Sequence, residues 1–324
     1  MDPAQTAIPD IRIDLRLARR ILARVSPNAV PTAIRRLADG GHSGAIFLAE
    51  VASGPALVIK VYPNEPSWRM AKEAYVARLL NRAPGVLAPR FFLADDTGEL
   101  LAFRYAVMTR LEGERLASCE PQMSEDELAS VWREVGAQMR LIHNVPMEAY
   151  GYIADGRLTA RADSNRDYMD GMWRAKLEQF RALGGDRSLA AAMDEKWRGR
   201  LDLLDLCRAP KLCHYDAHPG NLMAAREATR WRLSGLFDFE DSFAGDPLLD
   251  LAKCVHFARV GTAARWRGLL EGYGPIENRA WEETVELYRL YQAVEYWDWI
   301  AFLQRPESEC ASVLDGIRET LEEL

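Results

Sequence analysis

The chain has 324 residues, more than the roughly 150 of one compact domain, so we expect two lobes or domains. Hydrophobic residues make up 48% and charged residues 27%, which excludes a mainly disordered chain, and no run approaches the ~18 apolar residues of a membrane span. The net charge is −7 with no basic stripe, which disfavours nucleic-acid binding because phosphate contacts need lysine and arginine.

Hydrophobic periodicity predicts a leading helix and then a β-rich first lobe. Apolar residues recur every three or four positions over 11–25, which is typical of a helix. A second helical pattern begins at Pro66. Short segments bounded by glycine, proline and serine predict strands, and these are expected at 34–38, 45–51, 56–62, 90–93 and 100–108.

From Glu125 onward, helical patterns dominate. The helices are expected at 125–144, 165–183, 188–206, 247–259, 262–272, 279–304 and 309–323. Short strands at 211–213, 221–224 and 231–237 carry loops between them. The order predicts a small β-rich lobe followed by a larger helical lobe.

The strongest chemical signal is the loop from His214 to Asn221, which fits the pattern H-x-D-x-x-x-x-N of kinase-type phosphoryl-transfer enzymes. In such a loop Asp216 accepts the proton of the substrate hydroxyl, and Asn221 reaches a magnesium ion between nucleotide phosphates. The alternative is a polar turn without a catalytic role.

A second carboxylate follows at Asp238, where an apolar strand ends 22 residues after Asp216. Magnesium prefers hard oxygen donors, so Asp238 and Asn221 are the predicted metal ligands. Taken alone, an aspartate in this place is more often a turn former. Asp246 is expected to cap the helix that begins at Pro247, and Asp250 to anchor the catalytic loop from inside.

In the first lobe, Lys60 lies in an otherwise apolar strand, where an unpaired ammonium would be costly. Glu73, on the next predicted helix, can pair with it and so direct Lys60 toward the α- and β-phosphates. The alternatives are an edge-strand lysine and a solvated glutamate. The glycine-rich segment 40–44 joins two strands, and Ser43 and Gly44 are expected to cover phosphates, although a plain hairpin turn has the same pattern.

Taken in chain order, the glycine-rich segment, the strand with Lys60, the helix with Glu73, the loop with Asp216 and the strand end at Asp238 resemble the aminoglycoside phosphotransferase family. This family consists of small-molecule kinases similar in fold to protein kinases. Residues 214–221 resemble its H-G-D-x-H-x-x-N loop, residues 236–240 its I-D-[FW]-[DE] segment, and residues 245–252 its G-D-P-x-x-D-L-A segment. The resemblance runs from about Ile34 to Trp299. It implies an α+β, two-lobed protein-kinase-like fold, with a small β-rich N-lobe and a larger, mainly helical C-lobe. The expected division is a nucleotide-binding lobe at 1–108, a linker at 109–113 and a catalytic and substrate-binding lobe at 114–324.

The resemblance also implies ATP and Mg²⁺ as cofactors, with Thr109 and Leu111 holding adenine through backbone atoms. One departure is Tyr215, where the family usually has glycine, so a bulky ring is expected to narrow the acceptor pocket. Asp250 follows Asp238 by only twelve positions, which leaves no room for a protein-kinase activation segment. We therefore expect a small acceptor.

The acceptor itself is indicated only by composition. Residues 271–324 hold 13 acidic and 4 basic residues, which favours an amine-bearing acceptor. Within the helix expected at 280–304, aromatic and carboxylate side chains form a stripe about 100° around the helix axis from the apolar stripe. Such a stripe would suit a cationic acceptor. The alternative is a helix face that only meets solvent. The candidate acceptor residues are Glu240, Glu295, Asp298 and Trp299.

The sequence thus predicts an ATP-dependent phosphotransferase acting on a hydroxyl of a small cationic molecule, such as an aminoglycoside-like antibiotic. The alternatives are a kinase of a metabolite (choline, homoserine or a sugar) and a nucleotide-binding scaffold without turnover. Five cysteines, odd in number and without a C-x-x-C pair, and the absence of a signal-like opening predict a cytoplasmic protein. The oligomeric state is not predicted.

Overall fold

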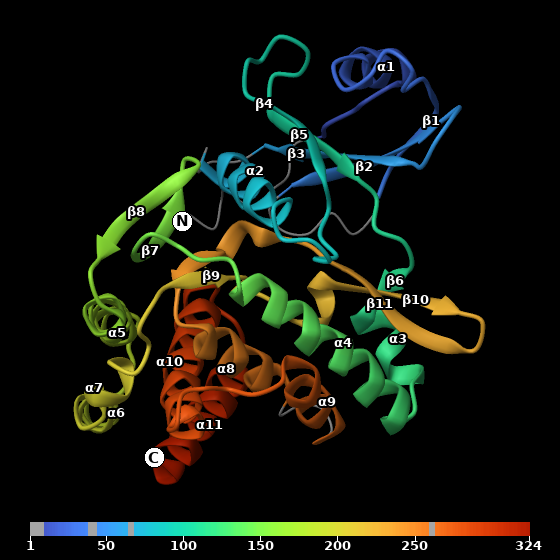
Figure 1. The fold of residues 1–324 in the computed structure, drawn as a ribbon. Coiled ribbons are helices and arrows are strands. Elements are labelled where there is room, and N and C mark those ends of the chain that lie inside the picture. Colours follow the sequence, from blue (N-terminus) through green and yellow to red (C-terminus); the bar gives the residue numbers. More distant parts are fainter. Residues whose placement is uncertain (1–9, 38–43, 64–67, 259–262) are drawn as a thin grey trace.

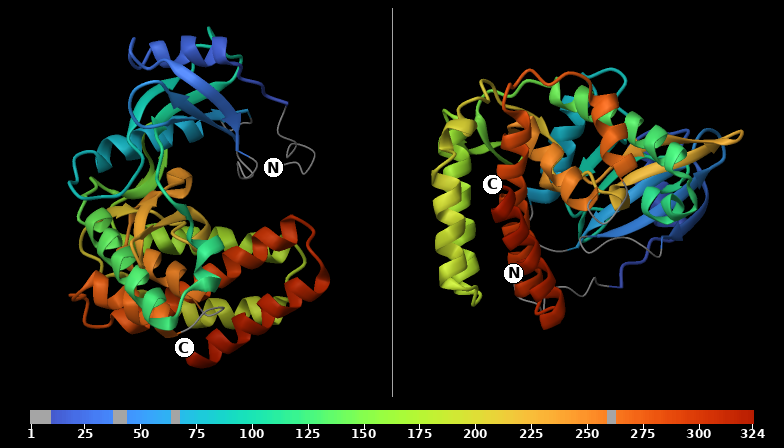
Figure 2. Two further views of the ribbon diagram at one scale, coloured as in Figure 1. Left: turned by 90° about the vertical axis from the view of Figure 1, so that its right-hand side faces the viewer. Right: turned by 90° about the horizontal axis from the view of Figure 1, so that it is seen from below.

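The computed structural model describes residues 10–37, 44–63, 68–258 and 263–324 (Figure 1). The chain forms two lobes, a smaller one built on an antiparallel sheet and a larger one made mainly of helices (Figure 2). The predicted α+β, two-lobed, kinase-like fold is confirmed. No helix within the described ranges is long and apolar enough to cross a lipid bilayer.

The N-lobe sheet has five strands in the order β1-β2-β3-β5-β4, each antiparallel to its neighbours. The helix α1 (Leu15–Ala23) begins where the Asp14 side chain accepts a 2.7 Å hydrogen bond from the Leu17 backbone N–H. The helix α2 (Trp68–Leu80) packs on β4 and β5 and also contacts the C-lobe. The strands are β1 (Pro31–Arg36), β2 (Ala45–Val51), β3 (Leu57–Tyr62), β4 (Phe91–Asp95) and β5 (Arg104–Thr109).

In the C-lobe, α4 (Glu125–His143) packs against α9, β11 and β9, and its first turn is closed by a capping box between Ser124 and Glu127. Its helices are α3 (Leu116–Cys119), α5 (Asn165–Ala182), α6 (Arg187–Arg198), α7 (Leu201–Leu204), α8 (Pro247–Ala258), α9 (Ala263–Tyr273), α10 (Trp281–Phe302) and α11 (Glu307–Glu323). Two small sheets carry the loops of interest, in the orders β11-β10-β6 and β8-β7-β12-β9. Their strands are β6 (Glu114–Arg115), β7 (Tyr150–Ala154), β8 (Arg157–Ala162), β9 (Lys211–Cys213), β10 (Leu222–Glu227), β11 (Arg230–Leu236) and β12 (Phe243–Gly245).

Several features of this lobe differ from the expectation, among them the short elements β6, α3 and β12, which were not predicted. The helix expected over 188–206 is divided into α6 and α7, because α6 ends at a C-cap on Gly199. The hairpin of β7 and β8 was not predicted. Its turn is Asp155-Gly156, both with positive φ (47° and 68°), and Asp-Gly is among the strongest short-range hairpin signals.

The helices α4 and α9 come so close at three positions that backbone lies against backbone. Three glycines line this contact, and a Cβ atom on any of them would overlap a backbone carbonyl oxygen of the facing helix: Gly136 that of Leu269, Gly268 that of Ala129, and Gly272 that of Arg133. Only glycine permits this approach. We call this contact the glycine seam.

Candidate functional site

Lys60 lies at the junction of the two lobes and binds carboxylates from both. Its Nζ atom lies 2.7 Å from Glu73 Oε2, 2.8 Å from Glu240 Oε1 and 3.3 Å from Asp238 Oδ1. The predicted ion pair with Glu73 on α2 is therefore present. The Lys60 and Glu73 side chains are buried, whereas the Asp238 side chain is about one third exposed. One ammonium thus joins the N-lobe strand β3 to the segment after β11.

The charges in this cluster set one another's protonation. Burial acts to lower the Lys60 pKa, but the charges of Asp238 and Glu73 outweigh it and hold that pKa well above its ordinary value. Burial raises the pKa of Glu73 to about 7, although Lys60 opposes this shift. The Tyr62 hydroxyl also donates to Glu73. Lys60 is therefore the fixed positive charge of the junction.

The predicted metal ligands, Asp238 and Asn221, each keep one side-chain oxygen atom without a hydrogen bond to the described residues. Asp238 follows β11 in a left-handed conformation (φ 68°), and although burial raises its pKa, Lys60 holds that pKa below its usual value. The Asn221 amide donates 2.7 Å to the Asp216 carboxylate and 3.0 Å to its carbonyl, which leaves the Asn221 carbonyl oxygen available to a cation. This set of hard oxygen donors fits Mg²⁺. The side-chain oxygens of Glu73, Asp238 and Glu240 lie within 4.8 Å of one another.

The catalytic loop follows β9 and is held from inside the C-lobe. Asp250 on α8 accepts the backbone N–H groups of His214 (2.6 Å) and Tyr215 (2.5 Å), so the predicted anchor is confirmed. Asp216 keeps a quarter of its side chain exposed, and the ring nitrogen Nε2 of His218 lies 3.6 Å from its Oδ2 atom. The loop therefore presents one carboxylate to solvent while its backbone is fixed.

Asp246 caps α8, as expected. Its Oδ1 atom accepts the Leu248 backbone N–H at 3.0 Å, and its Oδ2 atom accepts the hydroxyl of Tyr288 at 2.9 Å. Burial raises the pKa of this carboxyl group above its ordinary value.

Tyr215 adopts the left-handed conformation (φ 67°) that glycine tolerates best. Its hydroxyl donates a 2.7 Å hydrogen bond to Glu295, its ring meets the edge of Phe243 at 5.1 Å, and the Lys253 ammonium lies 4.7 Å from the ring centroid. The bulky ring next to Asp216 is thus held by contacts on several sides.

The acceptor candidates on α10 lie in three different environments. Glu295 lies 3.3 Å from Lys253 and 3.6 Å from Lys176; burial acts to raise its pKa, but these two lysines hold it below the usual value. Asp298 is 1% exposed, and neither carboxylate oxygen has a hydrogen-bond partner within the described residues. Burial raises its pKa to about 7. Trp299 is 51% exposed and stacks on Tyr296 at 5.9 Å.

Glu240, the fourth acceptor candidate, lies beside Lys60. Besides its contact with Lys60, its Oε2 atom lies 3.6 Å from Arg69. From the sequence, Glu240 was expected near the acceptor, and its position beside Lys60 was not anticipated.

Sequence reasoning missed Lys72 on α2. The side chain is fully buried, its Nζ atom has no hydrogen-bond partner within the described residues, and it lies 3.8 Å from the ring centroid of Tyr152 and 5.3 Å from that of Trp68. Burial lowers its pKa to about 7, although the charge of Asp241 opposes this shift. The sequence signal for this contact was the four-residue spacing of Trp68 and Lys72, which places both side chains on one face of the helix.

The predicted adenine and phosphate contacts lie on the N-lobe side. Thr109 ends β5, and its Oγ1 atom accepts the Arg90 N–H at 2.9 Å. The Leu111 side chain covers Gly235 of β11, and a Cβ atom on Gly44 would lie 2.6 Å from the Val61 carbonyl oxygen. Ser43 lies outside the described residues.

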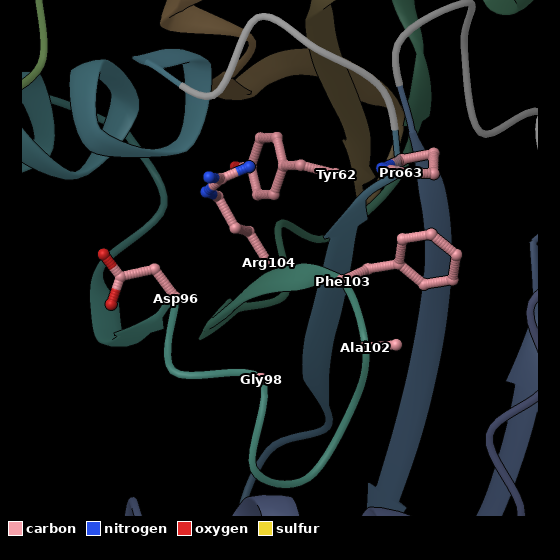
Figure 3. A pocket seen from close by; sticks show the side chains of 7 residues that line it. All are labelled: Tyr62, Pro63, Asp96, Gly98, Ala102, Phe103 and Arg104. Carbon is pink, nitrogen blue, oxygen red and sulfur yellow. The ribbon is translucent and has the colours of Figure 1, made fainter.

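A small cavity of about 220 Å³ lies at the outer end of the N-lobe sheet (Figure 3). It is lined by Tyr62, Pro63, Asp96, Gly98, Ala102, Phe103 and Arg104. None of these is among the predicted site residues. Tyr62 links the cavity wall to Glu73 through its hydroxyl.

Two lobes joined by the Lys60 cluster, with a loop that presents Asp216, define a kinase-like phosphotransferase. The chain belongs to the phosphotransferase enzyme family, whose model matches residues 33–287. The predicted family is confirmed, and so is the predicted enzyme class, a small-molecule kinase with an alcohol group as acceptor. Among curated proteins, none matches the chain.

Solved structures of aminoglycoside phosphotransferases share the fold. A ternary complex of a thermostable APH(4)-Ia mutant with AMP-PNP and hygromycin B has a TM-score of 0.69 and 16% identity, covering 94% of this chain and 97% of that one. The streptomycin-ATP-APH(2″)-IIa complex has a TM-score of 0.63 and 16% identity, covering 96% and 99%. ADP-bound APH(2″)-Ib has a TM-score of 0.62 and 19% identity, covering 95% and 97%.

Proposed function

We propose that this protein transfers the γ-phosphate of ATP to a hydroxyl of a small, amine-bearing molecule such as an aminoglycoside-like antibiotic. The observation that carries the proposal is the junction at Lys60, where one ammonium pairs with Glu73 of the N-lobe and Asp238 of the C-lobe. Nucleotides and aminoglycosides in the similar structures, AMP-PNP with hygromycin B and ATP with streptomycin, support both substrates.

In this mechanism the acceptor oxygen forms a bond to the γ-phosphorus while the bond from that phosphorus to the β-phosphate oxygen breaks, and ADP leaves. Asp216 accepts the proton of the acceptor hydroxyl. Lys60 faces the α- and β-phosphates, once these phosphates replace part of its present carboxylate shell. Asp238 and Asn221 would hold Mg²⁺, which neutralises charge between the phosphates when bound. Most of the catalysis is then positioning and charge stabilisation.

The remaining nucleotide contacts come from the N-lobe and the linker. Backbone groups of Thr109 and Leu111 hold adenine, and Ser43 and Gly44 cover the phosphates. Glu240 contributes to this side, because it contacts Lys60.

The strongest argument for an amine-bearing acceptor comes from Asp298. A buried carboxyl group without a hydrogen bond is costly, and an ammonium of the acceptor would remove that cost. Glu295 and the exposed ring of Trp299 complete the proposed acceptor surface. The five free cysteines support a reducing, cytoplasmic setting.

A metabolite kinase is the second candidate. The Tyr215 ring fills space next to Asp216, and two lysines already neutralise Glu295. Both observations favour an acceptor smaller than an aminoglycoside, for example choline, homoserine or a sugar.

The test measures ADP release with MgATP across a panel of hygromycin B, streptomycin, choline, homoserine and glucose. Asp216→Ala is expected to lower turnover by about 10²–10⁴-fold while ATP affinity stays within a few-fold. The matched control, Asp202→Ala, removes an exposed carboxylate on α7 and is expected to leave turnover unchanged. Retained turnover in Asp216→Ala would exclude this residue as the base. ATP binding without acceptor-dependent ADP release across the panel would favour a scaffold. EDTA is expected to abolish turnover and excess Mg²⁺ to restore it.

A further inference from the structure

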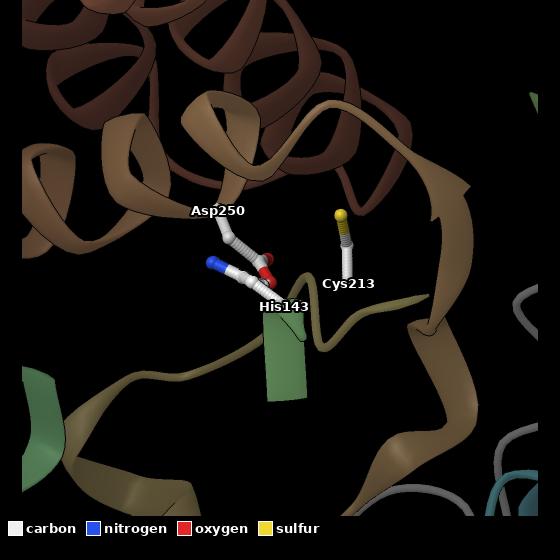
Figure 4. Close-up of side chains that lie close together, drawn as sticks. All are labelled: His143, Cys213 and Asp250. Atoms are coloured by element: carbon white, nitrogen blue, oxygen red, sulfur yellow. Dashed lines mark hydrogen bonds and ion pairs between the residues drawn. The ribbon is translucent and has the colours of Figure 1, made fainter. Parts of the chain in front are cut away.

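A chain of buried polar groups runs from α9 to the catalytic loop. Figure 4 shows its central pair, His143 and Asp250. His143, the last residue of α4, has its Nδ1 atom 2.9 Å from the Tyr273 hydroxyl and its Nε2 atom 3.0 Å from Asp250 Oδ2. The side chains of His143 and Asp250 are 2% and 1% exposed. Asp250 in turn binds the backbone N–H groups of His214 and Tyr215.

Cys213 completes a group of three metal-ligating residue types, but its surroundings do not suit a metal ion. Both nitrogens of His143 have partners, and both oxygens of Asp250 accept backbone N–H groups. Burial raises the pKa of the Cys213 thiol well above its ordinary value, so the sulfur stays protonated. The polar atoms of His143 and Asp250 thus already have hydrogen-bond partners within the protein. Through Asp250 they hold the backbone of the catalytic loop.

The loop needs this support because of Tyr215. A residue other than glycine at φ 67° is strained, and this conformation persists only where its surroundings hold it. The Tyr215 N–H is one of the two groups that Asp250 holds, and Asp216 follows directly. The direction of the Asp216 side chain therefore depends on where the Asp250 carboxylate lies.

We propose that His143 is a positioning residue for the catalytic base. Its Nε2–H donates to Asp250, because a carboxylate only accepts, and its Nδ1 atom lies at hydrogen-bond distance from the Tyr273 hydroxyl. These two contacts fix the carboxylate that holds the strained peptide before Asp216. This rests on the proposed role of Asp216. In a chain with glycine at position 215, the same hydrogen bond would matter less.

Three substitutions separate this role from simple packing. His143→Gln places an amide N–H near the position of Nε2, His143→Asn is too short to reach Asp250, and His143→Leu removes all polar atoms. We expect Asn and Leu to lower kcat by about 10–100-fold, with the KM for ATP changed less than about 3-fold, because a small misplacement of a reacting group is that costly. Gln is expected to restore kcat to within about 3-fold of the wild type. The rate is measured as ADP release with whichever acceptor of the panel is active, or without an acceptor, when water receives the phosphoryl group.

The decisive measurement repeats His143→Asn in a Tyr215→Gly background. Glycine adopts this φ without strain, so the loss in kcat caused by His143→Asn is expected to shrink at least about 5-fold. An undiminished loss, a wild-type kcat in both Asn and Leu, or a Gln variant as slow as Leu would overturn the proposal. If Leu does not fold, the comparison of Gln with Asn decides.

Hydrogen exchange of the His214 and Tyr215 amides tests the anchor without any assumption about the reaction. We expect these amides to exchange about 10-fold faster in His143→Asn than in His143→Gln. Equal exchange rates would contradict the anchor itself. Faster exchange with no change in kcat would refute the positioning role and leave the proposed function standing.

Discussion

The Tyr215 hydroxyl donates a 2.7 Å hydrogen bond to Glu295, which lies 80 residues further along the chain on α10. Glu295 also pairs with Lys253 of α8 and Lys176 of α5. The residue before the proposed base is thus connected to three helices of the C-lobe. A change in the charge around Glu295 is therefore expected to alter the position of Tyr215 in the catalytic loop.

Tyr215→Phe removes this hydrogen bond and keeps the ring. We expect the free energy of unfolding to fall by about 1.5–3 kcal/mol, because the hydrogen bond is made to a charged, mostly buried group. Urea unfolding measures this change. The control is Tyr75→Phe, whose hydroxyl makes no hydrogen bond within the described residues and whose loss should change little. An equal effect of both substitutions would contradict the prediction.

Lys60→Met leaves three carboxylates without their shared cation. Because their oxygens lie within 4.8 Å of one another, we expect a loss of about 3–5 kcal/mol in the free energy of unfolding. We also expect a fall of at least about 10²-fold in kcat/KM for ATP. Adding Glu73→Gln should recover stability but not turnover. Lys196→Met, at a lysine without an ion pair within the described residues, is the matched control. Recovery of turnover in the double variant would exclude Lys60 from phosphate binding.

Asp298→Asn is expected to stabilise the free protein at neutral pH. The folded pKa of Asp298 is raised to about 7 by burial, with Lys176 and Glu295 as its charged neighbours. The folded state therefore binds more protons than the unfolded state between about pH 4 and pH 7, and stability is lost as the pH rises through this window. Thermal unfolding should show no difference from wild type near pH 4 and a higher Tm for the variant near pH 7.5. The exposed Asp163→Asn is the control.

The same variant tests the acceptor surface. If an ammonium of the acceptor pairs with Asp298, Asp298→Asn should raise the KM for an amine acceptor about 10-fold or more and leave the KM for ATP unchanged. An unchanged acceptor KM would remove Asp298 from the proposed acceptor site.

Lys72→Met is expected to stabilise the protein most at low pH. The Lys72 pKa is lowered to about 7 by burial, so below that pH the folded state contains a buried charge, and stability rises as the pH increases from about 7 to 10. Methionine keeps the apolar stem, and the ring face of Tyr152 offsets part of the cost of the ammonium in the wild type. We expect a gain of about 1–2 kcal/mol at pH 6 that shrinks by pH 9.5. A gain independent of pH would show that packing, not charge, is responsible.

The sequence predicted those parts of the site that are local in the chain or fixed by spacing. The pair of Lys60 and Glu73 followed from an isolated lysine in an apolar strand, and the roles of Asp246 and Asp250 followed from their places at the start of α8.

Contacts between distant segments were not predicted. Glu240 meets Lys60 across 180 residues, and Lys72 of the N-lobe meets Tyr152 on a C-lobe hairpin. Periodicity shows which helix face is apolar but not which segment covers it, so Asp298 was placed on an open surface and is in fact buried.

The glycine seam between α4 and α9 has a consequence for how this protein can change over time. Because backbone faces backbone there, replacing any of Gly136, Gly268 or Gly272 requires the two helices to separate, and α4 ends in His143. Even an alanine in the seam would therefore move the imidazole ring relative to α8. These three positions are therefore closed to any side chain as long as the two helices keep this distance.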